Sequence, residues 1–343
     1  MMKVNILIFI MLLFLCDVKG AKKETIDTLS RVFFINPSNG WMIGSTLNNS
    51  FIFYSSDGGT SWNEQYKSNK VDISDLKFID DQIGWAIGHK GKILCTNNGG
   101  YSWFNQVSGT TEDLSTLYIV NQKKVYIGGN NGIFLYTKDG GFTWHKHNLD
   151  TTYPLKNIQF INKDTGYISA ITAFFQTNDG GQTWEKIDIA NKTAFFCINF
   201  TSLNNGWAHN EQSLFRTVNK GKTWLEANIS QPGYFCDPIF VDDDHGWIAK
   251  VDGTEGSIVS VKNAKDKYSF SYIFSTNDGG ITWKEQKFIK SDIDHSAWIL
   301  NMFFLDQLNG WAIGRGGLIL VTKDGGQTWN KSSKIFLTTN DTD

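Results

Sequence analysis

The chain has 343 residues and a formal net charge of −2, so no overall electrostatic field recruits nucleic acid or an acidic membrane surface. Aromatic residues make up 14% of the chain, which favours a β-rich core. A period of about 3.6 residues, typical of amphipathic helices, is absent after residue 20. The composition therefore predicts an all-β protein without a nucleic-acid partner.

The first 20 residues have the pattern of a secretory signal peptide. Lys3 precedes an apolar run at residues 6–15, and we expect cleavage after Gly20. The run is shorter than the roughly 20 residues of a membrane span. A lipoprotein signal ending at Cys16 is the alternative, although Leu15 stands where a small residue usually precedes that cysteine. We expect export to the periplasm, the cell surface or the medium, with no transmembrane segment in the mature chain.

An octet with the pattern Ser/Thr-x-Asp-Gly-Gly-x-Thr/Ser-Trp occurs seven times. Asp-Gly indicates a tight turn between two strands, because Gly adopts a positive φ at little cost and Asp accepts backbone N–H bonds. Asn98 replaces the Asp in the second copy, and the fifth has Asn219-Lys220 in place of Asp-Gly. We assign a structural role to the octet carboxylates or amides and to the tryptophans, which are Asp57, Asn98, Asp139, Asp179, Asn219, Asp278 and Asp324 with Trp62, Trp103, Trp144, Trp184, Trp224, Trp283 and Trp329.

A second motif, usually Gly followed by an aromatic residue, precedes each octet. Its aromatic residues are Trp41, Trp85, Tyr126, Tyr167, Trp207, Trp247 and Trp311. The regular spacing of the two motifs defines a unit of four short strands with the octet between the third and fourth, which is typical of a β-propeller blade. After the signal at 1–20 we predict one domain at 21–343 with a polar tail at 337–343. Its seven blades are expected at roughly 26–66, 67–107, 108–148, 149–189, 190–229, 230–288 and 289–336. Both end units look complete, so no obvious strand is left over to join the two ends of the ring.

The octets resemble the Asp-box, or bacterial-neuraminidase repeat. The whole unit, with Gly-Trp before the octet, resembles the repeat of the photosystem II stability/assembly factor-like family over essentially the whole mature chain. The resemblance implies a seven-bladed propeller that acts as a non-catalytic binding platform for a protein client. It also implies that the octets are structural and lie on the face away from the ligand. Plant and cyanobacterial members are associated with an arginine-rich patch, whereas this chain has only Arg31, Arg216 and Arg315.

Glycoside hydrolysis is the enzymatic alternative. A sialidase-like enzyme needs an arginine triad, because the planar guanidinium binds a substrate carboxylate bidentately. The three arginines fall near a first strand, in a third strand and in a turn, which argues against a triad. Other glycosidases need two carboxylates roughly 5–10 Å apart. The acidic run Asp242-Asp243-Asp244 is interpreted as a solvated turn instead.

Cysteine and histidine give no sign of a metal or cofactor site, and none is expected. Cys197 and Cys236 lie near equivalent points of neighbouring repeats, so a disulfide between them stays open beside two buried thiols. The histidines show no ligand spacing and are expected at the surface.

Two insertions predict the binding face. Trp247 and Trp283 lie about 18 residues further apart than their counterparts, and the step from Trp283 to Trp311 is 28 residues instead of 23. Second-to-third and fourth-to-first turns share one face of a propeller, so both insertions fall on that face at neighbouring blades. Extended loops carry binding residues more often than the scaffold does. The candidate binding residues are Tyr268, Asp292, Asp294, His295, Trp298 and Arg315.

The sequence thus predicts an exported, non-catalytic propeller that binds a protein client in an envelope or extracellular assembly. A carbohydrate-binding or adhesive module, with a glycan as ligand, is a second alternative beside the glycosidase.

Overall fold

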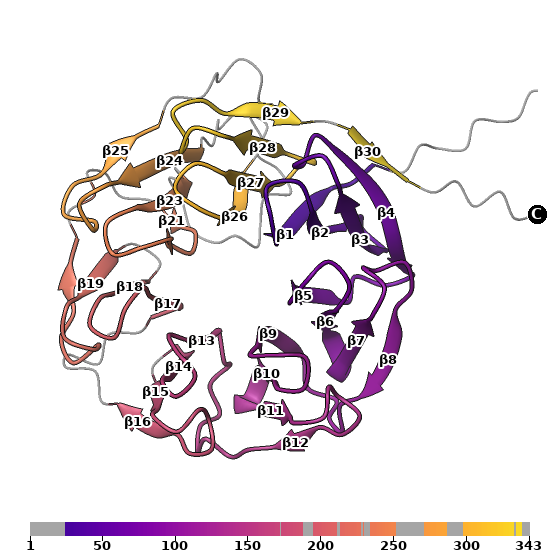
Figure 1. The fold of residues 1–343 in the computed structure, drawn as a ribbon, viewed down its shortest axis with the longest axis horizontal. Coiled ribbons are helices and arrows are strands. Elements are labelled where there is room, and N and C mark those ends of the chain that lie inside the picture. Colours follow the sequence, from indigo (N-terminus) through magenta and orange to yellow (C-terminus); the bar gives the residue numbers. More distant parts are fainter. Residues whose placement is uncertain are drawn as a thin grey trace, which may run out of the picture.

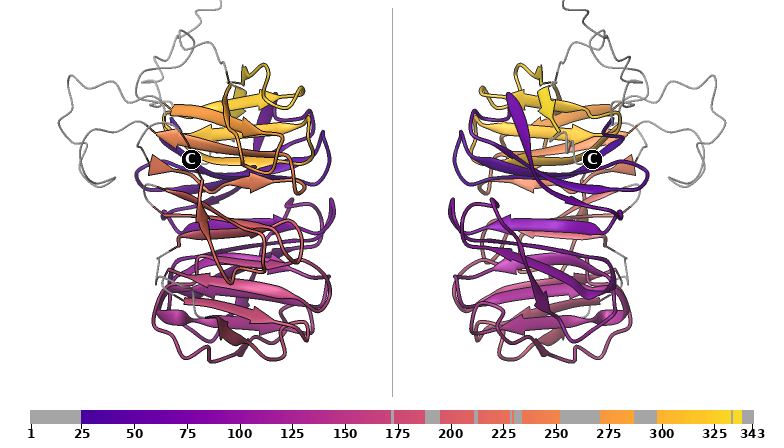
Figure 2. Two further views of the ribbon diagram at one scale, coloured as in Figure 1. Left: turned by 90° about the vertical axis from the view of Figure 1, so that its left-hand side faces the viewer. Right: turned by 90° about the vertical axis from the view of Figure 1, so that its right-hand side faces the viewer.

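The computed structural model describes residues 25–171, 173–187, 195–210, 213–227, 229, 234–251, 271–286, 298–332 and 334–337. Seven antiparallel sheets follow one another around a central axis and form a ring of blades (Figure 1). Seen from the side, the ring is a disc that is narrower along its axis than across it (Figure 2). In the described residues, helix is limited to the short 3-10 turns η1 (His89–Gly91) and η2 (Asn130–Gly132). The prediction of an all-β, seven-bladed propeller is confirmed.

Within each blade the first strand lies beside the axis and the fourth at the rim (Figure 1). The strands of blades 1 and 2 are β1 (Thr28–Phe34), β2 (Gly40–Ser45), β3 (Ser50–Ser55), β4 (Ser61–Ser68), β5 (Ile73–Phe78), β6 (Gly84–Gly88), β7 (Lys92–Thr96) and β8 (Phe104–Val107). Those of blades 3 and 4 are β9 (Leu114–Ile119), β10 (Val125–Gly129), β11 (Phe134–Thr137), β12 (His145–Lys146), β13 (Asn157–Phe160), β14 (Gly166–Ala170), β15 (Ala173–Thr177) and β16 (Glu185–Ile187). Those of blade 5 are β17 (Cys197–Phe200), β18 (Gly206–His209), β19 (Leu214–Thr217) and β20 (Leu225–Glu226). Those of blades 6 and 7 are β21 (Tyr234–Phe235), β22 (Ile239–Phe240), β23 (Gly246–Val251), β24 (Ser271–Thr276), β25 (Lys284–Glu285), β26 (Ile299–Phe304), β27 (Gly310–Gly314), β28 (Ile319–Thr322) and β29 (Asn330–Ser332).

The ring is closed by a strand that the sequence did not reveal. β30 (Lys334–Phe336) follows β29, leaves the seventh blade and pairs in parallel with β4, so that Ile335 lies opposite Trp62. The Ser332 hydroxyl also donates to the Thr60 carbonyl at 2.8 Å. The expectation that no strand is left over to join the ends is therefore wrong. The sequence hid this strand because it is only three residues long and continues directly from the last strand of the seventh blade.

The seams between blades are built by the two aromatic motifs together. The second-strand aromatic of one blade stacks on the phenylalanine that ends the first strand of the next blade, as Trp311 does on Phe34 with ring centroids 3.6 Å apart. The octet Trp of that next blade meets the same phenylalanine edge-on, as Trp62 does at 5.7 Å. The motif Gly is required because a Cβ on Gly40 would lie 2.5 Å from the Phe34 ring. Each repeat thus buries its aromatic residues against its neighbour, which is why the motifs recur at fixed spacing.

One seam departs from this pattern. Ile119 ends the first strand of blade 3 where the other blades have phenylalanine, and Val125, which pairs with it, takes the position of the motif Gly. Trp85 of blade 2 therefore packs in an aliphatic cluster that includes Leu117 and Val125. The two changes are physically coupled, because a side chain on residue 125 occupies the space that the ring fills elsewhere.

Candidate functional site

The octet turns share one pattern of hydrogen bonds, with one bond reversed in the two copies that carry Asn. In blade 3 the Thr137 hydroxyl donates to Asp139 Oδ1 at 2.7 Å, and Asp139 accepts the backbone N–H and the hydroxyl of Thr143 at 3.0 and 2.5 Å. The first octet Gly also donates its N–H to the turn between the first and second strands of its own blade, as Gly140 does to Lys123 at 2.9 Å. These two turn types therefore share one face of the ring, which we call the octet face.

The octet carboxylates are held as anions by these bonds. Donation from the hydroxyl and backbone N–H of Thr143 lowers the pKa of Asp139. The pKa of Asp179 is lowered in the same way by Thr183. Asn98 and Asn219 keep the turn by reversing one bond, since their amide nitrogens donate to the hydroxyls of Ser102 and Thr223 at 2.8 Å. These side chains thus accept hydrogen bonds from their own turns.

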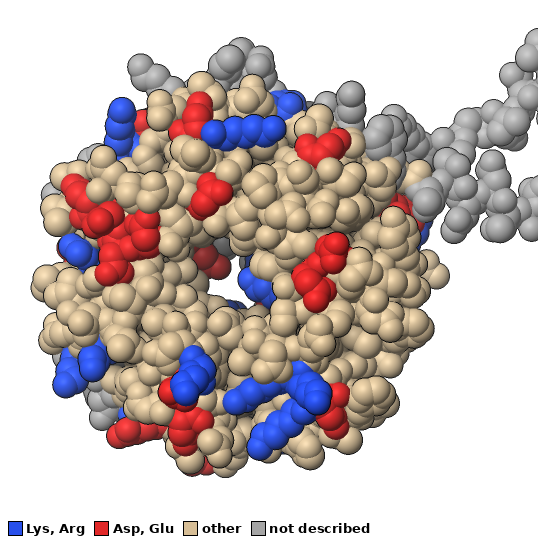
Figure 3. Space-filling view, in the orientation of Figure 1, with Lys and Arg blue, Asp and Glu red and all other residues tan. Residues whose placement is uncertain are grey.

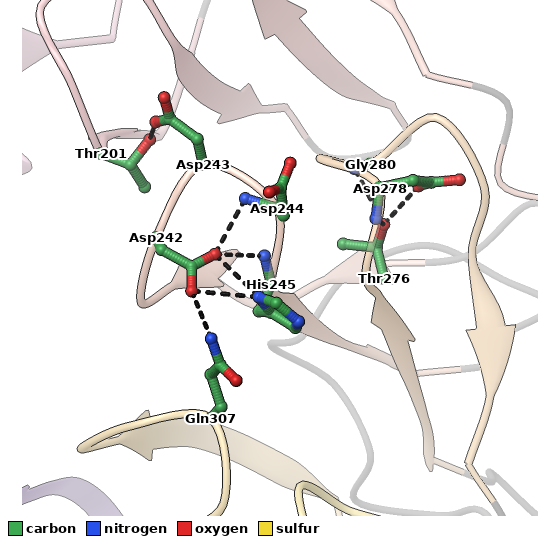
Figure 4. A network of polar contacts seen from close by, with 9 residues as sticks. All are labelled: Thr201, Asp242, Asp243, Asp244, His245, Thr276, Asp278, Gly280 and Gln307. Atoms are coloured by element: carbon green, nitrogen blue, oxygen red, sulfur yellow. Dashed lines mark hydrogen bonds and ion pairs between the residues drawn. The ribbon is translucent and has the colours of Figure 1, made fainter.

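The acidic turn of blade 6 ties three blades together on the octet face (Figure 4). Asp242 accepts the backbone N–H groups of Asp244 and His245 and the Gln307 amide of blade 7 at 2.8 Å. Asp243 accepts the Thr201 hydroxyl of blade 5. Partial burial opposes the charge on Asp242, but the backbone N–H of His245 and the Gln307 amide lower its pKa to about 2. The prediction of a merely solvated turn missed these contacts between blades.

The centre of the ring is open and has charged side chains on its wall (Figure 3). Arg31 on β1 lies 3.8 Å from Asp75 Oδ1 on β5, and Asp75 Oδ2 accepts the backbone N–H of Leu117 on β9 at 3.1 Å. Lys77 on β5 lies over the Phe33 ring of β1, 5.3 Å from its centroid. Polar groups of the inner strands thus connect successive blades.

A second polar group on this wall joins blades 5 and 6. The inner strand of blade 6 is split into β21 and β22, and the half-exposed Asp237 lies in the interruption. Its Oδ1 lies 3.0 Å from Nε2 of His209, whose Nδ1 is 3.1 Å from the Asn210 carbonyl. Both ring nitrogens therefore face acceptors. The expectation of surface histidines is wrong for His209, which is 4% exposed, and no sequence spacing signalled its pairing with Asp237.

The described cysteines are free thiols. Burial and the Asp237 carboxylate raise the pKa of Cys197 well above its ordinary value and that of Cys236 to about 12. The Cys236 thiol donates to the Ile299 carbonyl at 3.2 Å. Of the two alternatives left open by the sequence, the structure contains free thiols, buried at Cys197 and partly buried at Cys236, rather than a disulfide between these residues.

The face opposite the octets carries the turns in which the insertions were found. The predicted site residues Tyr268, Asp292, Asp294 and His295 lie outside the described residues. The other two are brought together: the Arg315 guanidinium lies over the Trp298 ring, 4.8 Å from its centroid, and the Arg315 N–H donates to the Trp298 carbonyl at 2.9 Å. We call this face the insertion face and these two residues the Arg315–Trp298 pair.

The pair lies at the seam of blades 7 and 1. Gly316 donates its N–H to the Asp27 carbonyl at 2.9 Å, and Arg315 forms a β-bridge with Thr28. Both side chains of the pair are partly exposed. Among the described residues no carboxylate lies within ion-pair distance of Arg315. Its guanidinium is a planar fork of N–H donors, a shape that suits a carboxylate.

The three arginines do not form a sialidase-like triad. Arg31 pairs with Asp75, Arg216 lies over the Trp207 ring at 5.9 Å, and Arg315 lies over Trp298. The three guanidinium groups thus have separate partners, one each in blades 2, 5 and 7. Within the described ranges, no cluster of three or more His, Cys, Asp or Glu side chains is placed to hold a metal ion. A helix of the length and apolarity needed to cross a bilayer is likewise absent from that part of the chain.

An open hollow of about 750 Å³ lies at the seam of blades 2 and 3, also on the insertion face. The end of β8, the connection at 108–112, the turn at Asn131 and the side chain of Lys146 line it. Glu112 forms its acidic wall and accepts the Asn131 amide at 2.8 Å. No motif in the sequence pointed to this hollow.

Comparison with protein families gives a match over most of the chain. The family described as photosynthesis system II assembly factor YCF48 matches residues 66–157, 146–269 and 240–337. A comparison with curated proteins gave no match.

Solved structures share the fold at low sequence identity. The structure titled "YCF48 bound to D1 peptide" is 18% identical with a TM-score of 0.68, covering 88% of this chain and 94% of that one. YCF48 from Cyanidioschyzon merolae is 16% identical with a TM-score of 0.65, covering 88% and 96%. A GH74 xyloglucanase from Xanthomonas campestris is 10% identical with a TM-score of 0.66, and the match covers 90% of this chain but 55% of the enzyme. At these identities the likeness shows the fold alone.

Proposed function

We propose that this chain, which belongs to the photosynthesis system II assembly factor YCF48 family, is a non-catalytic propeller. Its function would be to hold a segment of a protein client. A similar structure contains YCF48 with a D1 peptide, which supports a polypeptide as the class of ligand. The Arg315–Trp298 pair is the observation that carries the proposal for this chain.

The pair offers two kinds of contact to a polypeptide. The Arg315 guanidinium presents a planar fork of donors to a carboxylate, either an acidic side chain or a chain terminus. Trp298 orients that fork by stacking and adds apolar surface at low cost in side-chain entropy. A client segment with a carboxylate next to an apolar residue fits this arrangement.

The octet face is the less suitable surface for recognition. Its carboxylates are already bonded within their own turns, and Asp242 and Asp243 are bonded across the blade seams. A glycosidase would need a free pair of carboxylates, and this acidic turn does not supply one. We therefore keep glycoside hydrolysis as the outcome that would contradict the non-catalytic part of the proposal.

Export belongs to the same proposal. If residues 1–20 are a cleaved signal, the mature protein begins at Ala21, and the client is met outside the cytoplasm. The intact mass of the protein isolated from its own cells tests this. A chain beginning at Ala21 supports it, an acylated chain beginning at Cys16 indicates a lipoprotein, and retention of Met1 contradicts export.

Site-specific photo-crosslinking in native extract tests the binding face. We would place p-benzoylphenylalanine at position 298 and, as the matched control, at the exposed Leu308 of the octet face. The proposal predicts that the first protein crosslinks to one defined segment of a partner and that Arg315→Ala removes this product. Crosslinking to that partner only from position 308 would contradict it. If the protein hydrolysed xyloglucan or a sialoside, and a substitution in the chain abolished that activity, the protein would be an enzyme and the non-catalytic proposal would be wrong.

A further inference from the structure

The outer strands of the blades differ in how well their free edges are protected. An exposed strand edge is a template for pairing with another chain, and natural proteins block it with charged residues, very short strands or a covering element. β4 is covered by β30. The remaining outer strands that are only two or three residues long each carry a charged residue, and they are β12 (His145–Lys146), β16 (Glu185–Ile187), β20 (Leu225–Glu226), β25 (Lys284–Glu285) and β29 (Asn330–Ser332).

β8 is the exception among the described strands. It is four residues long, Phe104-Asn105-Gln106-Val107, and has no charge. It pairs with β7 on one side only and lies at the rim of the ring (Figure 1). Phe104 is 53% and Val107 88% exposed, so the strand presents apolar side chains beside an unpaired backbone. Each form of protection found at the other edges is missing here.

The same strand leads into the hollow on the insertion face. Gln106 and Val107 belong both to β8 and to the lining of the cavity of about 750 Å³. Lys146 and Glu112, on opposite elements of that lining, provide a donor and an acceptor. A free edge continuous with a pocket is the arrangement by which proteins bind an added strand, because main-chain bonds give affinity and the pocket selects a side chain.

The blade repeat itself shows that such an addition fits. β30 adds to the outer edge of β4, with Lys334, Ile335 and Phe336 opposite Ser61, Trp62 and Asn63. β4 and β8 are fourth strands of neighbouring repeats, so their outer edges are equivalent positions of the fold. The chain thus fills this position once with its own segment and leaves it unfilled in the next blade.

We propose that the edge of β8 binds an extended segment of a partner protein as a fifth strand of blade 2. The segment carries apolar side chains where it contacts Phe104 or Val107 and places a polar side chain between Glu112 and Lys146 in the hollow. This docking surface lies two blades from the Arg315–Trp298 pair. It goes beyond the proposed function, because binding at β8 does not depend on that pair.

A phage-displayed library of random nonapeptides, selected on the full mature chain, tests the proposal. The affinity of a selected, fluorescently labelled peptide is then measured by anisotropy against Phe104→Lys and Val107→Lys, which add the charge that the other edges carry. Leu225→Lys, on the exposed edge strand β20, is the matched control. We expect at least tenfold weaker binding for both β8 variants, less than a twofold change for the control, and slower hydrogen exchange of the amides at 104–108 in the complex.

Three results would overturn the proposal. One is a library that yields no peptide. Another is a peptide whose affinity falls with Arg315→Ala but not with Val107→Lys, which would leave the proposed function intact and refute the β8 site. The third is a parent chain that dimerises without peptide in sedimentation and becomes monomeric with Val107→Lys, because the edge would then be occupied by a second copy.

Discussion

The seam between blades 7 and 1 and the seam between blades 2 and 3 solve the same packing problem with different residues. At the first, Phe34 is stacked on Trp311, and Trp311 donates its Nε1–H to the Gly58 carbonyl at 2.9 Å. At the second, Trp85 is equally buried but packs in an aliphatic cluster with Ile119 in place of the phenylalanine, and its Nε1 has no hydrogen-bond partner among the described residues. One way to join blades in this ring is thus an aromatic sandwich, in which the phenylalanine lies between the stacked second-strand aromatic and the octet Trp. An aliphatic seam is another.

The difference teaches that the motif residues act as pairs. Glycine precedes the aromatic residue wherever phenylalanine ends the first strand, because a Cβ would lie 2.3 to 2.7 Å from that ring in every such blade. Where the ring is lost, at Ile119, the glycine opposite it is lost too, at Val125. The recurring Gly-aromatic motif therefore reflects one local packing contact, between the Gly and the phenylalanine ring that ends the first strand.

The largest effect is expected from truncating the aromatic seam. Trp311→Ala removes a fully buried ring, its stacking partner and its hydrogen bond, and it should lower the free energy of unfolding by about 3–5 kcal/mol. Trp85→Ala should cost about 1–2 kcal/mol less, since it loses neither a stacked ring nor a hydrogen bond. Urea denaturation of the two variants checks this, and equal costs would show that the sandwich adds nothing beyond buried area.

Exchanging the seam type should reveal the coupling directly. Ile119→Phe alone clashes with the Val125 side chain opposite it, and Val125→Gly alone leaves a cavity, so each should destabilise the protein by about 1–3 kcal/mol. Together they recreate the arrangement of the other blades, and we expect a favourable interaction energy of at least about 1 kcal/mol in a double-mutant cycle. Additive costs would mean that the missing Cβ and the ring are independent.

The seam of blades 6 and 7 adds a pH-dependent contact. The pKa of Asp242 is about 2 in the folded protein, below its unfolded value of 3.8, so its stabilisation is present above about pH 4 and is lost as the pH falls towards 2. Because the side chain is 40% exposed, we expect only about 1 kcal/mol. Asp242→Asn should be less stable than the parent by that amount near pH 7 and equal to it near pH 2. A difference that persists in acid would show that the carboxylate charge is not the cause.

The smallest effect concerns the octet that lacks its first glycine. Lys220 adopts a φ of +67°, close to the +74° of the equivalent Gly58. A non-glycine residue is strained in this region, so Lys220→Gly should raise the free energy of unfolding by about 0.5–1 kcal/mol. Thermal denaturation beside Lys222→Gly, two positions along in the same turn, provides the matched control. No gain at position 220 would mean that the lysine side chain offsets the strain.

The fold could be predicted from the sequence because of the repeats, in which each motif residue packs within its own blade or against the next one. Ring closure could not be predicted, because β30 has no sequence pattern of its own and is recognised only by its pairing with β4. Asp237 and His209 lie on neighbouring blades but follow no repeat, so nothing in the spacing linked them.

The candidate site was predicted only in part. Length differences between repeats placed Trp298 and Arg315 on one face, and the structure stacks them. The hollow beside β8 arises from backbone shape in repeats of ordinary length, so counting residues between motifs could not detect it. The missing charge on β8 is visible in the sequence but acquires meaning only when the other outer strands are known.

Hydrogen exchange of the full mature chain, with and without the client segment captured by crosslinking, tests the account most directly. The account predicts slower exchange on binding for the amides at 298 and 315–318, and unchanged exchange in the seven octet turns, whose bonds are already made within each blade. Protection of the octet turns with no change around Arg315 would contradict it, because the client would then bind the face that we consider structural.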